Sequence, residues 1–414
     1  MLTVQRVPPK MGIYTNASRF YKDGRPYKAI GVNHWSLLLG TWLDMTGLGV
    51  AGDTGAAADV RAMRNEFELP FARISAIPVD ESAIAAIHAS PSAWLAHFDA
   101  LVAKCEQEDF GLIVNLGWSL RKICAATYTI YGVYSPPSSM ADKTSTAWSL
   151  FAEFVTLIVS RYKASPAIYG WEIANEPDFT VGYEYHPSWN VDGSNPNYVN
   201  WGTRPDGGAW QTTDKMSMSQ WRAFSQNAIR LIHSLDPFGR FISSGSSHGN
   251  AFGMAAQTSA SPINSTFAQW DSGIDTLNWP RYRDQNFDVM SLHTYPNVAG
   301  TNSLYYQDFR THDGLIVDFK HFSSAAGVPL FVGEFGANYL DETGDKSSTT
   351  PEEEAANFSS AIDAIIENEV QLAAAWNYGG NAAGPIAWQK WLLTTSERKY
   401  QLNSLRSANR LIGN

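Results

Sequence analysis

The chain is 414 residues long, with 44% hydrophobic and 17% charged residues, which is enough for two domains or for one large one. Its formal net charge of −10 and the lack of any basic run argue against a nucleic-acid partner. No apolar stretch approaches the roughly 20 residues that cross a bilayer, so we expect no membrane partner. We also expect the protein to be a monomer. Two cysteines, Cys105 and Cys124, supply neither a disulfide framework nor a metal-ligand cluster, and whether they pair stays open.

The first part of the chain alternates short apolar runs with amphipathic segments. Residues 19–27 predict a hairpin, because Asp23 and Gly24 form a turn signal between β-prone residues. Residues 92–108 predict a helix with Cys105 on its buried face, since apolar side chains recur there at helical spacing. Strands are also predicted at 28–32, 69–74, 111–116 and 167–171, helices at 55–66 and 144–163, and loops at 39–55 and 117–143.

The second part of the chain continues this alternation. A long loop at 178–216 is rich in Tyr and Trp, and loops of this length inside a compact domain are usually functional. Pro351, followed by Glu352 and Glu353, opens a predicted helix that runs to about residue 368. The remaining predicted strands are 240–244, 287–292, 328–336 and 370–375, the remaining helices are 217–235, 305–325 and 400–411, and a further loop covers 246–285.

Eight predicted strands that alternate with helices indicate parallel strands joined by right-handed crossovers. We therefore predict an α/β fold: a single (β/α)8 TIM barrel over residues 1–414, with long inserted βα loops and a small N-terminal hairpin. An open doubly wound sheet is the alternative, but no Gly-x-Gly-x-x-Gly motif follows the first strand. Closure at eight strands rests on the count alone.

Two of the predicted strands end in a glutamate. One ends in Asn175 and Glu176 just before Pro177, which has no N–H to donate to a sheet. The strand at 328–336 carries Glu334 at its end. In a parallel barrel the carboxyl ends of the strands meet at one face, where active sites lie. Two carboxylates brought together in this way are what glycoside hydrolysis requires.

Other candidate site residues stand at or near the carboxyl ends of predicted strands. Each has an ordinary structural explanation when taken alone, such as a buried ion pair, a core histidine or core packing, but their shared placement favours one functional site. The 15 Trp and 18 Tyr of the chain suit a cleft that stacks sugar rings, as well as a large aromatic core. These further candidates are Asn33, His34, Arg73, Trp118, His293, Tyr295 and Trp376.

The segments 171–177 and 333–336 resemble the signatures of glycoside hydrolase family 5 and its wider clan of (β/α)8 retaining enzymes, which includes mannanases and cellulases. His293 and Tyr295 resemble the family's His-x-Tyr pair on strand six, Trp376 its strand-eight tryptophan, and Arg73 the arginine that ends strand two. The match covers the barrel in outline, from about residue 18 to 411.

The resemblance implies a retaining β-glycoside hydrolase with Glu334 as nucleophile and Glu176 as general acid/base, and with no metal or organic cofactor. Arg73 and Tyr295 would keep Glu334 ionised by charge and hydrogen bonding. The remaining implied roles are a hydrogen bond from Asn175 to the sugar 2-hydroxyl, orientation of Glu176 or sugar binding by His293, and a floor under the sugar from Trp376.

The substrate is predicted to be a β-1,4-linked polysaccharide or oligosaccharide. Cellulase-type members of the family usually carry a histidine at the end of strand three, whereas this chain reads Asn-Leu-Gly-Trp over residues 115–118, which favours mannan or glucomannan over β-glucan. The alternatives are an exo-acting β-mannosidase or β-glucosidase, an inverting hydrolase and a non-catalytic carbohydrate-binding protein. We expect a secreted or periplasmic protein whose signal peptide is absent from this sequence, with a cytoplasmic location as the alternative.

Overall fold

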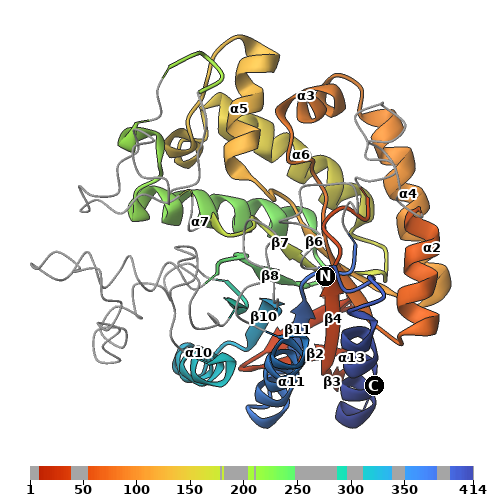
Figure 1. Cartoon of the computed structure of the whole chain (residues 1–414). Helices are drawn as coiled ribbons and strands as arrows, with labels where there is room; N and C mark the ends of the chain where they lie inside the picture. Colours follow the sequence, from red (N-terminus) through yellow and green to blue (C-terminus); the bar gives the residue numbers. More distant parts are fainter. Residues whose placement is uncertain are drawn as a thin grey trace, which may run out of the picture.

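The computed structural model describes residues 9–38, 55–177, 180, 204–208, 211–247, 287–295, 311–337, 350–379 and 392–413. At its centre is a parallel sheet with the strand order β8-β7-β6-β5-β4-β11-β10-β9, and helices surround it (Figure 1). The strands are β4 (Ala29–Asn33), β5 (Phe71–Ser75), β6 (Gly111–Asn115), β7 (Ile168–Glu172), β8 (Phe241–Ser243), β9 (Met290–Thr294), β10 (Leu330–Phe335) and β11 (Leu372–Ala375).

The two end strands of this sheet, β8 and β9, approach one another through a single residue. The backbone N–H of Asp288 donates to the carbonyl of Ile242 at 3.2 Å, and the N–H of Ile242 donates to Oδ2 of Asp288 at 2.8 Å. The eight strands therefore form a nearly closed barrel, and the predicted (β/α)8 fold is confirmed.

The inward face of the barrel changes character along each strand. Because side chains alternate with a period of two, Phe71 and Arg73 share the inner face of β5, and Phe241 and Ser243 share that of β8. The residues near the start of the strands join one buried apolar cluster. On β5, β6 and β8 the residues two positions further on, Arg73, Asn115 and Ser243, are polar and equally buried, so a polar layer begins above the apolar one.

A small antiparallel sheet covers the amino-terminal end of the barrel. Its strands are β1 (Ile13–Asn16), β2 (Arg19–Lys22) and β3 (Arg25–Pro26), and the turn at Asp23 and Gly24 has positive φ at both residues, as a tight hairpin turn requires. The predicted hairpin is confirmed, and β1 adds a strand that was not predicted. Ile13 and Phe20 are fully buried in the apolar layer of the barrel and close its lower end.

The two ends of the chain are tied together around β4. The side chain of Gln371 accepts from the N–H of Phe20 at 3.1 Å and donates to the carbonyl of Tyr27 at 3.1 Å. Asn409 in the last helix accepts from the N–H of Ile30 at 2.9 Å and donates to its carbonyl at 2.8 Å. The first barrel strand is thus anchored by residues close to the end of the sequence.

The predicted helices are present and have clear start signals. Ser145, Ser217 and Thr350 each accept a backbone N–H at a helix start, and the last two form complete capping boxes. Within the described ranges, no helix combines the length and the apolar character that crossing a membrane demands. The helices are α2 (Ala56–Arg61, continued by a π-helical turn at Ala62–Glu66), α3 (Glu81–Ala89), α4 (Pro91–Glu108), α6 (Thr146–Tyr162), α7 (Met218–Leu235), α10 (His312–Ala326), α11 (Pro351–Glu367) and α13 (Lys399–Ile412).

The prediction of a loop over 117–143 is wrong. This segment forms helix α5 (Leu120–Tyr131) and a 3₁₀ helix (Pro137–Ala141), and α5 packs against α3, which was not predicted either. Ser119 caps α5, and Gly132 ends it in the left-handed conformation.

Two further expectations are resolved by the described residues. Strand β9 begins three residues later than predicted, at Met290 instead of residue 287. Cys105 lies on the buried face of α4 as expected, and Cys105 and Cys124 are both buried free thiols. The predicted loops at 39–55, 178–216 and 246–285 lie largely outside the described residues, as do the first residues of the helix predicted at 305–325.

Candidate active site

The polar layer at the carboxyl ends of the strands is organised around Arg73, which is fully buried on β5. Its Nη1 donates to Asn33 and to Oε1 of Glu334, both at 2.8 Å, and its Nη2 donates to Asn175 at 2.6 Å. Its Nε donates to Oε1 of Glu172 at 2.8 Å, and Nη2 lies 2.6 Å from the same oxygen. These contacts engage every N–H of the guanidinium group. Burial alone would lower the pKa of Arg73, but Glu172 and Glu334 raise it above its usual range.

A β-bulge in β10 aims Glu334 into the barrel. Val332 pairs with Leu292 and Glu334 pairs with His293, so Gly333 is an extra residue that faces no partner on β9. A Cβ on Gly333 would lie 3.0 Å from Nε2 of His293, which explains why a glycine precedes the glutamate. The bulge therefore sets Glu334 opposite His293.

Both oxygens of Glu334 are engaged. Arg73 contacts Oε1, and the hydroxyl of Tyr295 donates to Oε2 at 2.6 Å. Burial raises the pKa of Glu334 above its usual range, and the nearby charge of Glu176 adds to this. His293, Arg73 and the Tyr295 hydroxyl oppose the rise without cancelling it. The two groups expected to favour ionisation do so, but burial outweighs them.

Glu176 follows β7 in an unusual backbone conformation. Its φ is +43°, in the left-handed region that few non-glycine residues adopt, and its N–H donates to the carbonyl of Gly245 at 2.8 Å. Gly245 also has positive φ, and a Cβ there would lie 1.8 Å from the carbonyl oxygen of Ala174. The chain after β8 is thus pressed against the chain after β7, and this contact fixes the backbone of Glu176.

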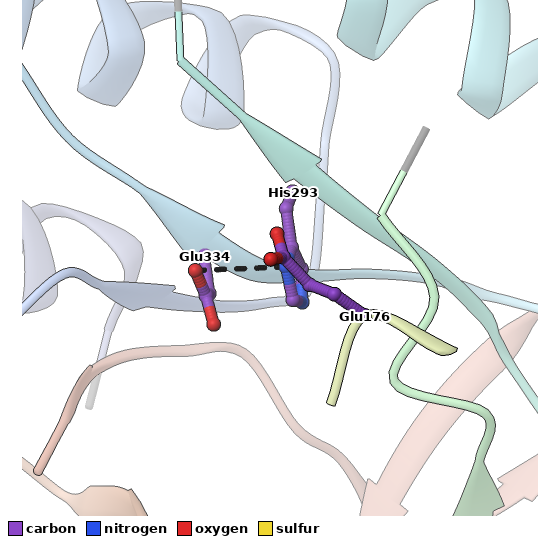
Figure 2. Close-up of side chains that lie close together, drawn as sticks. All are labelled: Glu176, His293 and Glu334. Atoms are coloured by element: carbon purple, nitrogen blue, oxygen red, sulfur yellow. Dashed lines mark hydrogen bonds and ion pairs between the residues drawn. The ribbon is translucent and has the colours of Figure 1, made fainter. Parts of the chain in front are cut away.

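Glu176, His293 and Glu334 converge from three different strand ends (Figure 2). Nδ1 of His293 lies 3.0 Å from Oε1 of Glu176 and 3.5 Å from Oε2 of Glu334. One oxygen of each carboxylate and one ring nitrogen of His293 all lie within 4.8 Å of one another. Among the described residues this trio alone has the composition and spacing to hold a metal ion, but hydrogen bonds between its members already account for their closeness. The Glu176 side chain is 15% exposed and that of Glu334 is 5% exposed, so Glu176 is the more open of the two.

Two tryptophans lie beside this network. The rings of Trp118 and Trp376 stack with centroids 6.0 Å apart and planes 26° apart. The guanidinium carbon of Arg73 lies 4.7 Å from the centroid of the Trp118 ring, which is cation–π distance. Aromatic rings therefore lie beside the arginine that contacts Glu334, and such rings suit a sugar-binding site.

One candidate from the sequence, His34, points away from the carboxylates. Strand alternation turns its side chain to the face opposite Asn33, where Nε2 lies 3.1 Å from Oδ2 of Asp59 on α2. Its ring packs beside Tyr378, and a Cβ on Gly379 would lie 1.9 Å from it. His34 therefore supports the turn that follows β11. The network and the tryptophans beside it bring together the other candidates: Asn33, Arg73, Trp118, Asn175, Glu176, His293, Tyr295, Glu334 and Trp376.

Three residues linked to Arg73, namely Asn115, Glu172 and Ser243, were not among the candidates. Asn115 and Ser243 flank Glu172 in register on β6 and β8, and both donate to its carboxylate, at 2.7 and 2.9 Å. Asn33, which was a candidate, also has a structural task, since its amide donates to the carbonyl of Gly333 at 2.9 Å. An acidic residue within an otherwise apolar buried strand was the available signal for Glu172.

The protein has a parallel eight-stranded barrel with two facing glutamates at the strand ends, and arginine, histidine, tyrosine and tryptophan lie around them. These features are typical of the class of barrel glycoside hydrolases. The sequence model described as cellulase (glycosyl hydrolase family 5) matches residues 57–382, which is more than half of the chain. The protein therefore belongs to glycosyl hydrolase family 5 and is a β-glycosidase, which confirms the resemblance seen in its sequence.

Solved structures with the same fold cover nearly the whole chain. The endo-1,4-β-mannanase from Rhizomucor miehei is 16% identical with a TM-score of 0.62, covering 97% of this chain and 99% of its own. The family 5 mannosidase from the same organism is 14% identical with a TM-score of 0.63, covering 97% and 98%. The endoglucanase catalytic domain from Thermobifida fusca is 13% identical with a TM-score of 0.53, covering 96% and 97%. No match was found among curated protein sequences.

Proposed function

We propose that the protein is a retaining endo-β-1,4-mannanase that hydrolyses mannan or glucomannan, with Glu334 as nucleophile and Glu176 as general acid/base. The observation that carries this proposal is the distance between the two carboxylates: an oxygen of Glu176 lies within 4.8 Å of an oxygen of Glu334. Retaining enzymes hold their carboxyl groups about 5–5.5 Å apart, whereas inverting enzymes leave roughly 6.5–9.5 Å for a water molecule.

In the first step Glu176 gives its proton to the leaving glycosidic oxygen while Glu334 attacks the anomeric carbon. Two carboxylates this close repel when both are ionised, so the free enzyme keeps one proton between them. Glu176 is the more exposed of the two, in keeping with a role beside the leaving group. In the second step Glu176 takes a proton from water, which attacks the glycosyl-enzyme and releases Glu334.

The neighbouring groups have distinct tasks in this scheme. Arg73 and Tyr295 each hold one oxygen of Glu334 and fix its orientation. Arg73 also donates to Oδ1 of Asn175, so the amide N–H₂ of Asn175 must point the other way, where it donates to the sugar 2-hydroxyl. Trp376 supplies the ring face under the reacting sugar.

The preference for mannan over cellulose rests on the end of β6. No histidine stands there, and the amide of Asn115, the last residue of β6, already donates to Glu172 and to the carbonyl of Ala174 at 2.6 Å. A mannanase and a mannosidase are among the structures with this fold, although an endoglucanase is as well. A polysaccharide substrate also fits a protein that is secreted or periplasmic, and we propose that it acts as a monomer.

A hydrolysis screen tests the proposal. The purified protein is incubated with mannan, glucomannan, carboxymethylcellulose, xylan and aryl β-glycosides, and product lengths and the anomer first released are recorded. We expect mixed mannooligosaccharides released as the β-anomer. Release of monosaccharide alone would establish exo action, the α-anomer would establish inversion, and no turnover on any substrate would reject the enzymatic function.

A further inference from the structure

The carboxylate of Glu172 is the most enclosed acidic group of the polar layer. Its side chain has no exposed surface. Oε1 accepts from Nε of Arg73 at 2.8 Å and from Asn115 at 2.7 Å, and Oε2 accepts from the hydroxyl of Ser243 at 2.9 Å. Every one of these contacts is a hydrogen-bond donor to a carboxylate oxygen of Glu172.

Glu172 and Glu334 lie on two sides of the same cation. Arg73 presents Nε and Nη2 to Glu172 and Nη1 to Glu334. The buried group therefore contains one positive charge and two negative ones when both carboxylates are ionised. In a low-dielectric interior this excess of negative charge strongly disfavours the ionised form of each carboxylate. The negative charge of Glu172 opposes, at Glu334, the positive potential of Arg73.

Glu172 is also connected to the other side of the site. The hydroxyl of Ser243 that donates to Glu172 accepts from the N–H of Gly245 at 3.1 Å, and the carbonyl of Gly245 holds the N–H of Glu176 at 2.8 Å. One buried carboxylate thus joins the two glutamates that face each other, through Arg73 on one side and through Ser243 and Gly245 on the other.

We propose that Glu172 is a positioning residue whose negative charge offsets part of the positive charge of Arg73. It thereby limits how strongly the ionised form of Glu334 is stabilised. This inference rests on the proposed function, because it gives Glu334 the role of nucleophile. A carboxylate that is stabilised too strongly is a weaker nucleophile, so the second anion keeps Glu334 reactive.

The test is Glu172→Gln, which removes the charge and keeps the shape. The amide oxygen can still accept from Arg73 and Asn115, and the amide N–H₂ can donate to Ser243. Without the opposing charge of Glu172, Arg73 stabilises ionised Glu334 more strongly. We therefore expect the acidic limb of kcat/KM to move to lower pH by about half a unit. We also expect the plateau kcat to fall several-fold, because Glu334 becomes less nucleophilic.

A titration that needs no substrate separates this inference from the proposed function. The unfolding free energy of the protein with Glu334 is compared with that of Glu334→Gln across pH, in the wild-type and in the Glu172→Gln background. Because the native pKa of Glu334 is raised, its protein loses stability relative to Glu334→Gln as pH rises from the unfolded to the native pKa. In the Glu172→Gln background this loss should be smaller and end at lower pH.

Glu354→Gln is the matched control, since Glu354 is a buried carboxylate that accepts from Arg398 at 2.8 Å, far from the site on α11. It should change overall stability and leave both profiles of Glu334 in place. An unmoved Glu334 titration in folded Glu172→Gln, or an equal shift in Glu354→Gln, would overturn the proposal. A wild-type enzyme without hydrolase activity would reject the proposed function alone.

Ser243→Ala decides the matter if Glu172→Gln does not fold. It keeps the charge of Glu172 but removes the donor on Oε2, so more negative potential reaches Glu334. The Glu334 titration should then move to higher pH, opposite to the shift expected for Glu172→Gln. A titration that stays in place in Ser243→Ala would overturn the proposal.

Discussion

The hydroxyl of Tyr295 donates a 2.6 Å hydrogen bond to Oε2 of Glu334, whereas Arg73 donates to the other oxygen, Oε1. This bond stabilises the ionised form and counteracts the burial that raises the pKa of Glu334. Tyr295→Phe should therefore move the acidic limb of kcat/KM to higher pH, by about one unit. The measurement is a pH profile with an activated aryl glycoside.

Tyr162→Phe is the matched control for this shift. Tyr162 donates to the carboxylate of Asp99 at 3.0 Å, on the outer helices, so its loss removes the same type of bond away from the site. Its pH profile should coincide with that of the wild type. An acidic limb that stays fixed in Tyr295→Phe would show that the hydroxyl does not tune Glu334.

Glu334→Ala should lower kcat by roughly 10⁴-fold or more, because the nucleophile of the double displacement is gone. The truncated side chain leaves space for a small anion between Arg73 and Tyr295. Azide should therefore restore part of the turnover of an activated aryl β-glycoside and give the α-glycosyl azide, which product analysis by NMR identifies. A folded variant that azide does not rescue would count against the nucleophile role.

Glu176→Gln should affect substrates according to their leaving groups. Loss of the acid should slow polysaccharide hydrolysis by about 10²–10⁴-fold, since a sugar hydroxyl leaves poorly without a proton. An aryl glycoside with an acidic phenol needs little assistance and should lose far less in the first step. Equal losses on both substrates would argue that Glu176 is not the acid.

Gly245→Ala should damage both stability and turnover. The new Cβ would lie 1.8 Å from the carbonyl of Ala174, and the strand ends that fix Glu176 would have to separate. We expect a loss of about 2–5 kcal/mol in unfolding free energy and at least a roughly 100-fold loss in kcat.

Gly132→Ala separates steric overlap from backbone strain. Gly132 has φ +70°, close to the +71° of Gly245, but a Cβ there meets nothing within 4 Å. It should lose only the about 1–2 kcal/mol that a left-handed alanine costs, with kcat unchanged. If the two variants lose equal stability in urea unfolding, the close contact at Gly245 contributes nothing.

The alternation of strands and helices, and the placement of the two glutamates, could be predicted because each rests on local sequence. Helix α5 could not, because its residues 127–131 include β-prone Thr and Tyr side chains that hide the helical spacing of the buried face. There the burial of Leu120, Ile123 and Cys124 overrides local propensity.

The polar layer was only partly predictable for a different reason. Whether a side chain faces the barrel interior depends on register, and register shifts occur in β10 at Gly333 and in the pairing of β6 with β7. A single sequence does not reveal such bulges, so Glu172 was passed over. The outward direction of His34, by contrast, follows from simple alternation with Asn33 and could have been anticipated.

The anchoring of β4 has a consequence for synthesis of the protein in the cell. Ile30 and Asn409 are 379 positions apart, yet each backbone polar group of Ile30 is bonded to the Asn409 side chain. Synthesis must therefore pass Asn409 before Ile30 gains these two hydrogen bonds. In a chain that stops ahead of α13 both backbone groups of Ile30 lack these bonds, and we expect such a chain to aggregate more readily, since unpaired strand backbone can pair with another chain.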